Sequence, residues 1–242
     1  MKYLSELSEL NLFKYEDVVN ITGNEKNAQY VLKAYISKGL ISKIKKNYYA
    51  MYDLVNSTTF ANKYQIACGY NENDFISHHS VFEYYGAYNQ VYNTVDITTN
   101  INQKNFSFDG YDFIYHKSDN QIEVNLLNGI RISSIERAIV DCINDSKDFE
   151  YYELLECVSN INNIQINKII NYLDSLNIKL LYKKVGYVLS KFKDKFQIDN
   201  EFFIFCKEKA GNSRGYYDAS KKELLVYNSK WELYVYKDQE VS

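Results

Sequence analysis

The 242-residue sequence predicts an α+β protein that begins with a small helical module. Two observations predict this class. Three helical patterns and two short strand patterns fill the first fifty residues, and the rest of the chain carries grouped strand patterns followed by helical ones. Grouped strands favour an α+β arrangement over a parallel sheet of repeated strand–helix–strand units.

Three short helices are expected before residue 40. Leucines spaced by three residues define the first over residues 4–10, and apolar spacing defines the second around residues 15–19. The third begins at Thr22-Gly23-Asn24-Glu25, which has the S/T-x-x-E form of a capping box. It ends at Gly39, because glycine readily adopts the left-handed conformation that closes a helix.

The third helix has two distinct faces. Its apolar side chains recur at the spacing of a single helix face, and they are Ala28, Val31, Leu32, Tyr35 and Ile36. The opposite face carries no acidic residue and consists of Lys26, Gln29, Tyr30, Lys33 and Ser37. We therefore expect one face to pack inside the module and the other to meet solvent or a partner.

A β-hairpin is expected after the third helix. Residues 41–45 and 48–52 are rich in β-branched and aromatic side chains, and Asn47 between them tolerates the conformation of a tight turn. Three helices followed by a hairpin form the layout of a winged helix-turn-helix, which we place at residues 1–54. In that layout the third helix enters the major groove of DNA, and by analogy the hairpin lies against the adjacent phosphates.

The distribution of charge agrees with this placement. The whole chain has 28 basic and 31 acidic residues, a net charge of −3 that by itself argues against nucleic-acid binding. Residues 26–50, however, carry six lysines and no acidic residue. Lysines neutralise phosphates, and asparagine or glutamine can bond an adenine edge. The expected DNA-binding residues are Lys26, Asn27, Gln29, Tyr30, Lys33, Ser37, Lys43, Lys45 and Lys46.

Two other interpretations of this segment stay open. A lysine-rich helix face is often only solvated, and winged helices also serve as protein-binding modules.

Residues 60–242 are expected to form a mixed α+β domain. A helix is expected at 60–68, and a strand end, a serine-capped helix and a glycine stop at 75–86. Strands are expected at 91–99, 106–115, 122–127 and 130–132, and a helix from Ser133, with Ser133 and Glu136 spaced as a capping box. Helical spacing continues over 151–192, and a hairpin is expected at 224–236, turned at Asn228-Ser229.

Composition indicates a reduced protein of the cytoplasm. No apolar run approaches the roughly 20 residues of a membrane span, and the first residues lack the apolar stretch of a secretory signal. The four cysteines are scattered and form no C-x-x-C pair. The chain has 25 tyrosines beside many asparagines and lysines, all with A/T-rich codons, so tyrosine abundance alone does not indicate a ring-stacking surface.

A second basic cluster follows in the long helical region. It comprises Lys179, Lys183, Lys184, Lys191 and Lys193. The cluster is either a solvated helix face, an extension of the DNA footprint, or a surface that competes for a nucleic acid.

The remaining charged candidates are expected to be structural. His78, His79 and His116 show no metal-ligand spacing, so neither a metal nor a cofactor is expected. Arg137 and Asp141 are spaced i, i+4 and, with Glu136, predict a buried polar network rather than a catalytic group.

Asp112 with Glu123-Val124-Asn125 faintly matches the D…E-x-K arrangement of metal-dependent nucleases. Asparagine replaces the lysine of that arrangement, so we expect no catalytic residue here.

The chain resembles the AbiEi-type antitoxins of type IV bacterial toxin–antitoxin and abortive-infection systems, over residues 4–193. The segments that carry the resemblance are Gly39 to Ile44 leading to Tyr48-Tyr49, Phe75-Ile76-Ser77 with residues 80–86, Ile132 to Arg137 with Asp141, and Val185 to Leu189. Asn47 departs from the family, which usually has glycine in the hairpin turn.

The resemblance implies a bacterial, non-enzymatic antitoxin active in phage defence. Its first domain would bind repeats in the promoter of its own operon and repress it. Its second domain would counteract a co-encoded toxin that resembles a nucleotidyltransferase, without needing a tight complex. The alternatives are a nuclease with a winged-helix specificity domain and a stand-alone transcription regulator.

Overall fold

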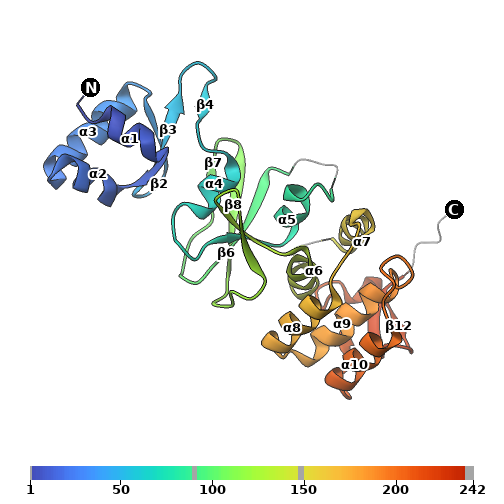
Figure 1. Cartoon of the computed structure of the whole chain (residues 1–242). Helices are drawn as coiled ribbons and strands as arrows, with labels where there is room; N and C mark the ends of the chain where they lie inside the picture. Colours follow the sequence, from blue (N-terminus) through green and yellow to red (C-terminus); the bar gives the residue numbers. More distant parts are fainter. Residues whose placement is uncertain (1, 89–91, 147–149, 238–242) are drawn as a thin grey trace. The chain divides into compact units, whose positions relative to one another are not determined.

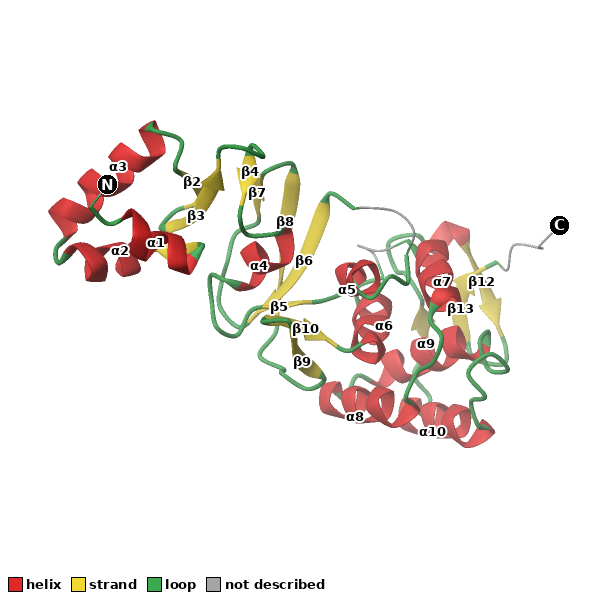
Figure 2. Ribbon diagram, turned by 45° about the horizontal axis from the view of Figure 1, so that its top comes forward, coloured by secondary structure: helices red, strands yellow, loops and turns green. Residues whose placement is uncertain are grey.

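The computed structural model describes residues 2–88, 92–146 and 150–237 and has a mixed α+β fold, as predicted (Figures 1 and 2). The chain forms two compact units, each considered by itself. The first comprises Met1–Ile76, Tyr92–Asn120 and Leu126–Ile132, and the second comprises Ser77–Val91, Gln121–Asn125 and Ser133–Ser242. The predicted boundary after residue 54 therefore falls inside the first unit, which continues to Ile76 and takes in later strands.

The first unit begins with six elements: α1 (Leu4–Leu10), β1 (Leu12–Lys14), α2 (Tyr15–Thr22), α3 (Glu25–Ser37), β2 (Ile41–Lys45) and β3 (Tyr48–Asp53). The three predicted helices and both hairpin strands are present. Strand β1 was not predicted, because three residues are too few to show an alternating pattern. It pairs antiparallel with β3, which also pairs with β2 and with the short β4 (Thr58–Thr59).

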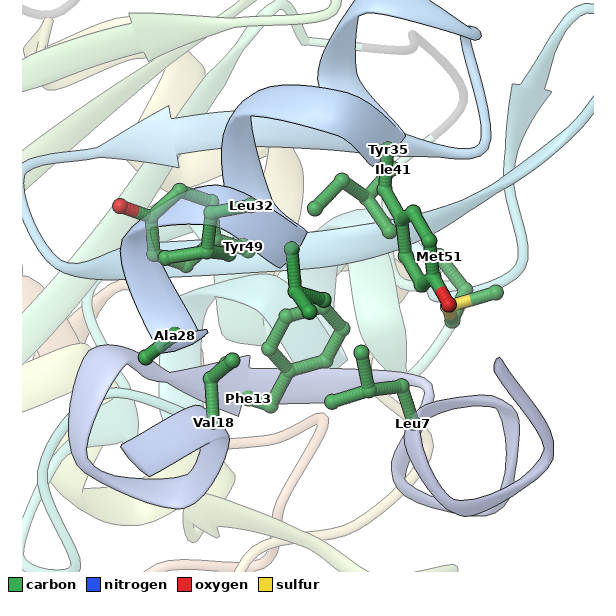
Figure 3. Packing of buried hydrophobic residues seen from close by; sticks show 10 residues of the cluster. Leu7, Phe13, Val18, Ala28, Leu32, Tyr35, Ile41, Tyr49 and Met51 are labelled. Atoms are coloured by element: carbon green, nitrogen blue, oxygen red, sulfur yellow. The ribbon is translucent and has the colours of Figure 1, made fainter. Parts of the chain in front are cut away.

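A hydrophobic cluster joins these helices to the small sheet (Figure 3). Leu7, Val18 and Leu32 come from the three helices, and Phe13 and Ile41 from the sheet; all five are at most 5% exposed. Burying such a side chain contributes about 1.5–3 kcal/mol. The predicted apolar face of α3 is buried at Ala28, Val31, Leu32 and Tyr35, but its fifth member, Ile36, is 41% exposed.

The predicted capping boxes are each displaced toward the C-terminus. Helix α3 starts after Asn24, whose side chain accepts a hydrogen bond from the backbone N–H of Asn27 at 2.9 Å, whereas Thr22 ends α2. In α6 (Ile135–Asn144) the cap is Ser134, which accepts from the backbone N–H of Arg137, because Ser133 still belongs to a strand.

A six-stranded sheet contains β5 (Phe75–Ile76), β6 (Thr94–Thr99), β7 (Phe106–Phe108), β8 (Tyr111–Lys117), β9 (Val124–Leu127) and β10 (Ile130–Ser133), in the order β7-β8-β6-β5-β10-β9. The sheet is mixed, since β6 pairs parallel with β8 and β5 pairs antiparallel with β6. The single strand predicted at 106–115 is a hairpin turned at Asp109-Gly110. The strand predicted from Val91 begins outside the described residues, and its observed part starts at Thr94.

Helix α4 (Lys63–Cys68) packs against β5 and β6, and it starts three residues later than predicted because Asn62 caps it. Helix α4, the β2–β3 hairpin and most of the six-stranded sheet therefore belong to the first unit, whereas Val124, Asn125 and Ser133 of the sheet belong to the second.

The second unit is largely helical. It contains α5 (His79–Tyr84), α6, α7 (Tyr151–Asn160), α8 (Ile166–Leu176), α9 (Lys179–Ser190) and α10 (Asn200–Ala210). The predicted serine cap of α5 is wrong, since its cap residue is His78, at φ 52°. Helix α10 was not predicted.

The predicted C-terminal hairpin is confirmed as β12 (Leu225–Asn228) paired with β13 (Leu233–Tyr236), and β11 (Gly215–Tyr216) adds a parallel strand. A short 3-10 helix, η1 (Lys222–Leu224), leads into β12. Among the helices that the structure describes, none has the length and apolar character that crossing a bilayer requires.

Candidate nucleic-acid interface

Helix α3 presents its polar face outward. Every residue predicted for this face is exposed: Lys26, Gln29, Tyr30, Lys33 and Ser37. Tyr30 is 75% exposed. The opposite face of α3 is held in the core described above, so the helix cannot rotate without unpacking it. The sequence therefore fixes which side chains of α3 are available to a partner.

The two ends of α3 hold this face in position. Asn24 caps the first turn, and Gly39 after the last turn has φ +68°, the left-handed conformation that was predicted for it. The Gly39 N–H donates to the carbonyl of Ile36, and the Leu40 N–H donates to that of Tyr35. These bonds carry the chain directly from α3 into β2.

The two amides expected to contact bases make local hydrogen bonds. Asn27 Nδ2 donates to the Thr22 carbonyl at 3.3 Å, and Gln29 Nε2 donates to the Tyr15 hydroxyl at 3.4 Å. Both residues are exposed. At 100° per residue, Asn27 lies about 120° from Lys33, outside the polar face, whereas Gln29 lies about 40° from Lys33, within it. Gln29 is the better placed of the two for reading a base edge.

The hairpin adds two exposed lysines, Lys43 on β2 and Lys46 in the turn. Asn47 has φ 60°, so asparagine supplies the left-handed turn residue for which the resembled family usually has glycine. Tyr48 and Tyr49, which follow, are buried and anchor β3. The turn therefore presents Lys46 from a firmly packed base.

Lys45 was expected to contact DNA, but the structure places it inside the first unit. Its Nζ donates to the Tyr115 hydroxyl at 2.8 Å and to Gln103 Oε1 at 3.4 Å, and it lies 3.7 Å from the centroid of the Tyr70 ring. Phe106 contributes a further ring at 4.9 Å. Lys45 thus holds the hairpin to the six-stranded sheet instead of offering its charge to a phosphate.

A bulge in β2 turns the Lys45 side chain inward, toward the six-stranded sheet. The pairing of β2 with β3 shifts between Lys43 and Lys45, so two residues of β2 oppose one residue of β3 at this point. Such a bulge re-aims the side chain beyond it. Burial lowers the pKa of Lys45 to about 8, although the nearby Asp74 carboxylate opposes this shift.

A groove beside α3 contains residues that sequence reasoning did not include. It has a volume of about 400 Å³, and Lys2 and Lys38 line it together with Asn27 and Tyr30. The predicted polar face of the third helix omitted both lysines, because Lys2 lies near the start of the chain and Lys38 follows α3. The local absence of acidic residues in 26–50 was the signal that included Lys38.

The second basic cluster does not exist as one surface. Lys183 is only 2% exposed, and its Nζ donates to the Ser213 carbonyl at 2.6 Å and lies 3.3 Å from Glu232 Oε2. Lys184 packs 5.6 Å from the centroid of the Tyr217 ring, and burial lowers its pKa. Lys191 and Lys193 are half-buried, and Lys179 is exposed. Hydrophobic neighbours surround α9 on several sides, which the lysine spacing did not reveal.

Arg137 and Asp141 form a buried ion pair, and Glu136 is buried beside it on α6 with a separate backbone partner; a single network of all three was expected. Arg137 is 1% exposed; its Nε donates to Asp141 Oδ2 at 3.2 Å, and Nη1 donates to the Ile122 carbonyl at 2.6 Å. The Tyr172 hydroxyl of α8 donates to Asp141 Oδ1 at 2.6 Å. Glu136 accepts from the backbone N–H of Gln165 at 2.9 Å. The network fastens α6 to α8 and to the segment before β9.

The histidines have polar partners in their own units. In the second unit, His78 lies between Ser77 Oγ at 2.9 Å and Asp145 Oδ2 at 3.1 Å, and His79 is half-buried in the first turn of α5. In the first unit, His116 Nε2 is 2.7 Å from Asp96 Oδ1.

The two carboxylates of the nuclease-like pattern belong to different units. Asp112 accepts from the Ser107 hydroxyl in the first unit, and Glu123 lies 3.6 Å from the Lys168 ammonium in the second. Each is engaged with a neighbour of its own.

Comparisons with known proteins show the fold alone. The chain is similar to the crystal structure of the RV2827C protein from Mycobacterium tuberculosis, with a TM-score of 0.68 and 11% sequence identity over 97% of this chain and 90% of that one. No protein-family model matches the sequence. No curated protein matches it either.

Proposed function

We propose that this protein is a DNA-binding antitoxin of the AbiEi type, whose first residues form a winged helix-turn-helix. The observation that carries the proposal is the outward face of α3. Lys26, Lys33 and Lys46 are exposed there or beside it, Gln29 and Tyr30 lie between them, and residues 26–50 contain no acidic side chain. A positively charged helix face flanked by a basic hairpin fits a major groove and its phosphates.

The order of elements supports a winged helix. A strand, β1, lies between the first two helices and pairs with the second strand of the hairpin. The hairpin therefore belongs to a four-stranded sheet, in the order β1-β3-β2 with β4 paired to β3, that closes one side of the helical cluster. A hairpin held in this way keeps Lys43 and Lys46 at a fixed position relative to α3.

The antitoxin part of the proposal rests on the resemblance in the second half of the chain. The motif residues Glu136, Arg137 and Asp141 are occupied in packing α6, which supports a structural role for them. We propose that this unit counteracts a co-encoded nucleotidyltransferase-like toxin without catalysing a reaction. The first unit would repress the shared operon.

Two experiments separate the parts of this proposal. Duplex DNA from upstream of the gene, titrated with full-length protein, should bind more tightly than a scrambled duplex of equal length. Co-expression of the adjacent toxin with full-length protein should restore growth, and Lys26→Gln/Lys33→Gln/Lys46→Gln should still restore it. Point substitutions are preferable to truncation after residue 54, because Tyr48 donates a hydrogen bond to the Ile66 carbonyl and its ring packs at 5.5 Å from Tyr70.

Equal binding of the upstream and scrambled duplexes would contradict the operator role. Failure of the wild-type chain to rescue growth would contradict the antitoxin role.

A further inference from the structure

A cavity in the second unit gathers lysines from three separate parts of the sequence. It has a volume of about 330 Å³, which lies in the range of small-molecule sites. Lys193 comes from the segment after α9, Lys207 from α10, and Lys230 from the loop between β12 and β13. The described residues that line the cavity include no carboxylate.

Two aromatic residues, Phe203 and the buried Trp231, are among the lining residues of the cavity. Trp231 is 2% exposed, and its ring centroid lies 6.2 Å from that of Phe203, with the two planes at 76°. The backbone N–H of Trp231 donates to Asn228 Oδ1 at 3.1 Å, which fixes the loop. The indole also packs on Gly186 of α9, where a Cβ would come within 2.5 Å of it. These contacts hold Trp231 in place beside the cavity.

The chemistry of the lining points to an anion that also carries an aromatic ring. Three ammonium groups around one cavity repel one another, and a polyphosphate would relieve this repulsion through charge-assisted hydrogen bonds. Lys207 Nζ already lies 5.1 Å from the centroid of the Trp231 ring, so cationic and aromatic groups adjoin. Asn200, at the start of α10, adds an amide that can bond a base edge or a sugar hydroxyl.

Acidic residues occur nearby in the sequence but do not line the cavity. Asp199 and Glu201 flank Asn200, and Glu208 follows Lys207. All three lie outside the set of lining residues. They reduce the overall charge of α10 without placing a negative group where a phosphate would sit.

We propose that this cavity binds a nucleoside triphosphate, with Lys193, Lys207 and Lys230 on the phosphates and the base against Phe203, whose ring packs edge-on to the buried Trp231. This site lies in a different unit from the DNA-binding face and goes beyond the proposed function. Binding at either site can fail without affecting the other inference.

Trp231 provides a direct readout, because it is the only tryptophan in the sequence. Full-length protein would be titrated separately with ATP, GTP, CTP and UTP up to about 5 mM, with fluorescence excited at the red edge of the indole band and affinity checked by calorimetry. We expect saturable binding of at least one triphosphate. The corresponding nucleoside and inorganic triphosphate should each bind at least about tenfold more weakly.

The variant Lys193→Gln/Lys207→Gln/Lys230→Gln should weaken binding at least about tenfold, and each single substitution about three- to tenfold. The matched control is Lys179→Gln/Lys222→Gln/Lys237→Gln, which removes three exposed lysines of the same unit that do not line the cavity. It should bind as the wild type does. Circular dichroism and the unfolding midpoint would verify that both variants fold.

Three results would each overturn the assignment. They are the absence of saturable binding to all four triphosphates, equal affinity for the cavity variant and the wild type, and equal affinity for inorganic triphosphate and the nucleotide, which would make the site a bare anion site.

Discussion

The three lysines of the hairpin differ in what their ammonium groups contact. Lys43 and Lys46 are exposed, whereas Lys45 lies among the rings of Tyr70, Phe106 and Tyr115. If the hairpin binds DNA as proposed, Lys45 acts through the position of the hairpin, and the two exposed lysines act through their charge. A substitution at each position has a distinct consequence for DNA binding.

Lys46→Gln should weaken DNA binding and make the negative slope of log K against log[salt] shallower by about one, because one phosphate contact is lost. Lys45→Met should weaken binding while keeping the wild-type slope, since its charge contacts tyrosines rather than phosphate. Fluorescence anisotropy at several salt concentrations measures both quantities. An equal loss of slope in the two variants would show that Lys45 does reach the DNA.

The pH dependence of stability should also depend on Lys45. Its folded pKa is about 8 and its ordinary pKa is 10.5, so between these values the unfolded state binds more protons than the folded state. The contribution of Lys45 to the free energy of unfolding therefore increases as pH rises from about 8 to about 10.5. The half-buried Cys68 thiol acts oppositely, because desolvation raises its pKa to about 12.

The contribution of Lys45 is therefore measured by comparing wild type with Lys45→Met, which removes only that group. The stability of wild type minus that of Lys45→Met, obtained from urea unfolding, should increase between pH 8 and pH 10. A constant difference over this interval would mean that burial does not shift the pKa of Lys45.

At the scale of elements, helix ends and the α6 network determine how the surfaces are held. Asn24 satisfies the N–H of Asn27 at the start of α3. Asn24→Ala should lower the free energy of unfolding by about 1 kcal/mol, because a helix cap is lost. Thr22→Val is a useful comparison: Thr22 was predicted to be this cap, but its hydroxyl donates to the Val18 carbonyl inside α2. The α3 cap of Asn24 should remain in Thr22→Val. Urea denaturation measures the free energy of unfolding of each variant, and equal values for Asn24→Ala and wild type would contradict the assignment.

The network of α6 should be among the most sensitive parts of the second unit. Arg137→Met leaves Asp141 buried without its cationic partner and should cost about 3–5 kcal/mol. Tyr172→Phe removes one hydrogen bond to the same carboxylate and should cost about 1–3 kcal/mol, since the acceptor is charged. Chemical denaturation followed by circular dichroism measures both. A loss below about 1 kcal/mol for Arg137→Met would contradict a buried structural pair.

Local patterns predicted α1, α2, α3 and the C-terminal hairpin, because the signal for each lies within a short stretch of neighbouring residues. They missed features that depend on distant residues. The inward turn of Lys45 needs both a bulge in β2 and rings some 25 to 70 positions later in the chain. The burial of Lys183 depends on Ser213 and Glu232, and no local pattern around α9 encodes them.

At the scale of the whole molecule, charge is segregated in a way that the net value of −3 conceals. One set of lysines lies on α3 and the hairpin, and another surrounds the cavity between α10 and the β12–β13 loop. Tyrosine abundance, by contrast, serves packing in many places: Tyr48, Tyr172 and Tyr217 are each at most 2% exposed. The positions of the lysines, rather than their number, support the two proposed binding sites.

The central claim is that α3 and the hairpin bind double-stranded DNA, and a salt titration tests it most directly. Wild-type protein with upstream duplex should give a slope of log K against log[salt] of about −4 to −5, corresponding to about four to six phosphates. Lys26→Gln/Lys33→Gln/Lys46→Gln should make this slope shallower by about three, whereas Lys179→Gln/Lys222→Gln/Lys237→Gln should leave it unchanged. Equal slopes and affinities for wild type and the first variant would contradict the claim.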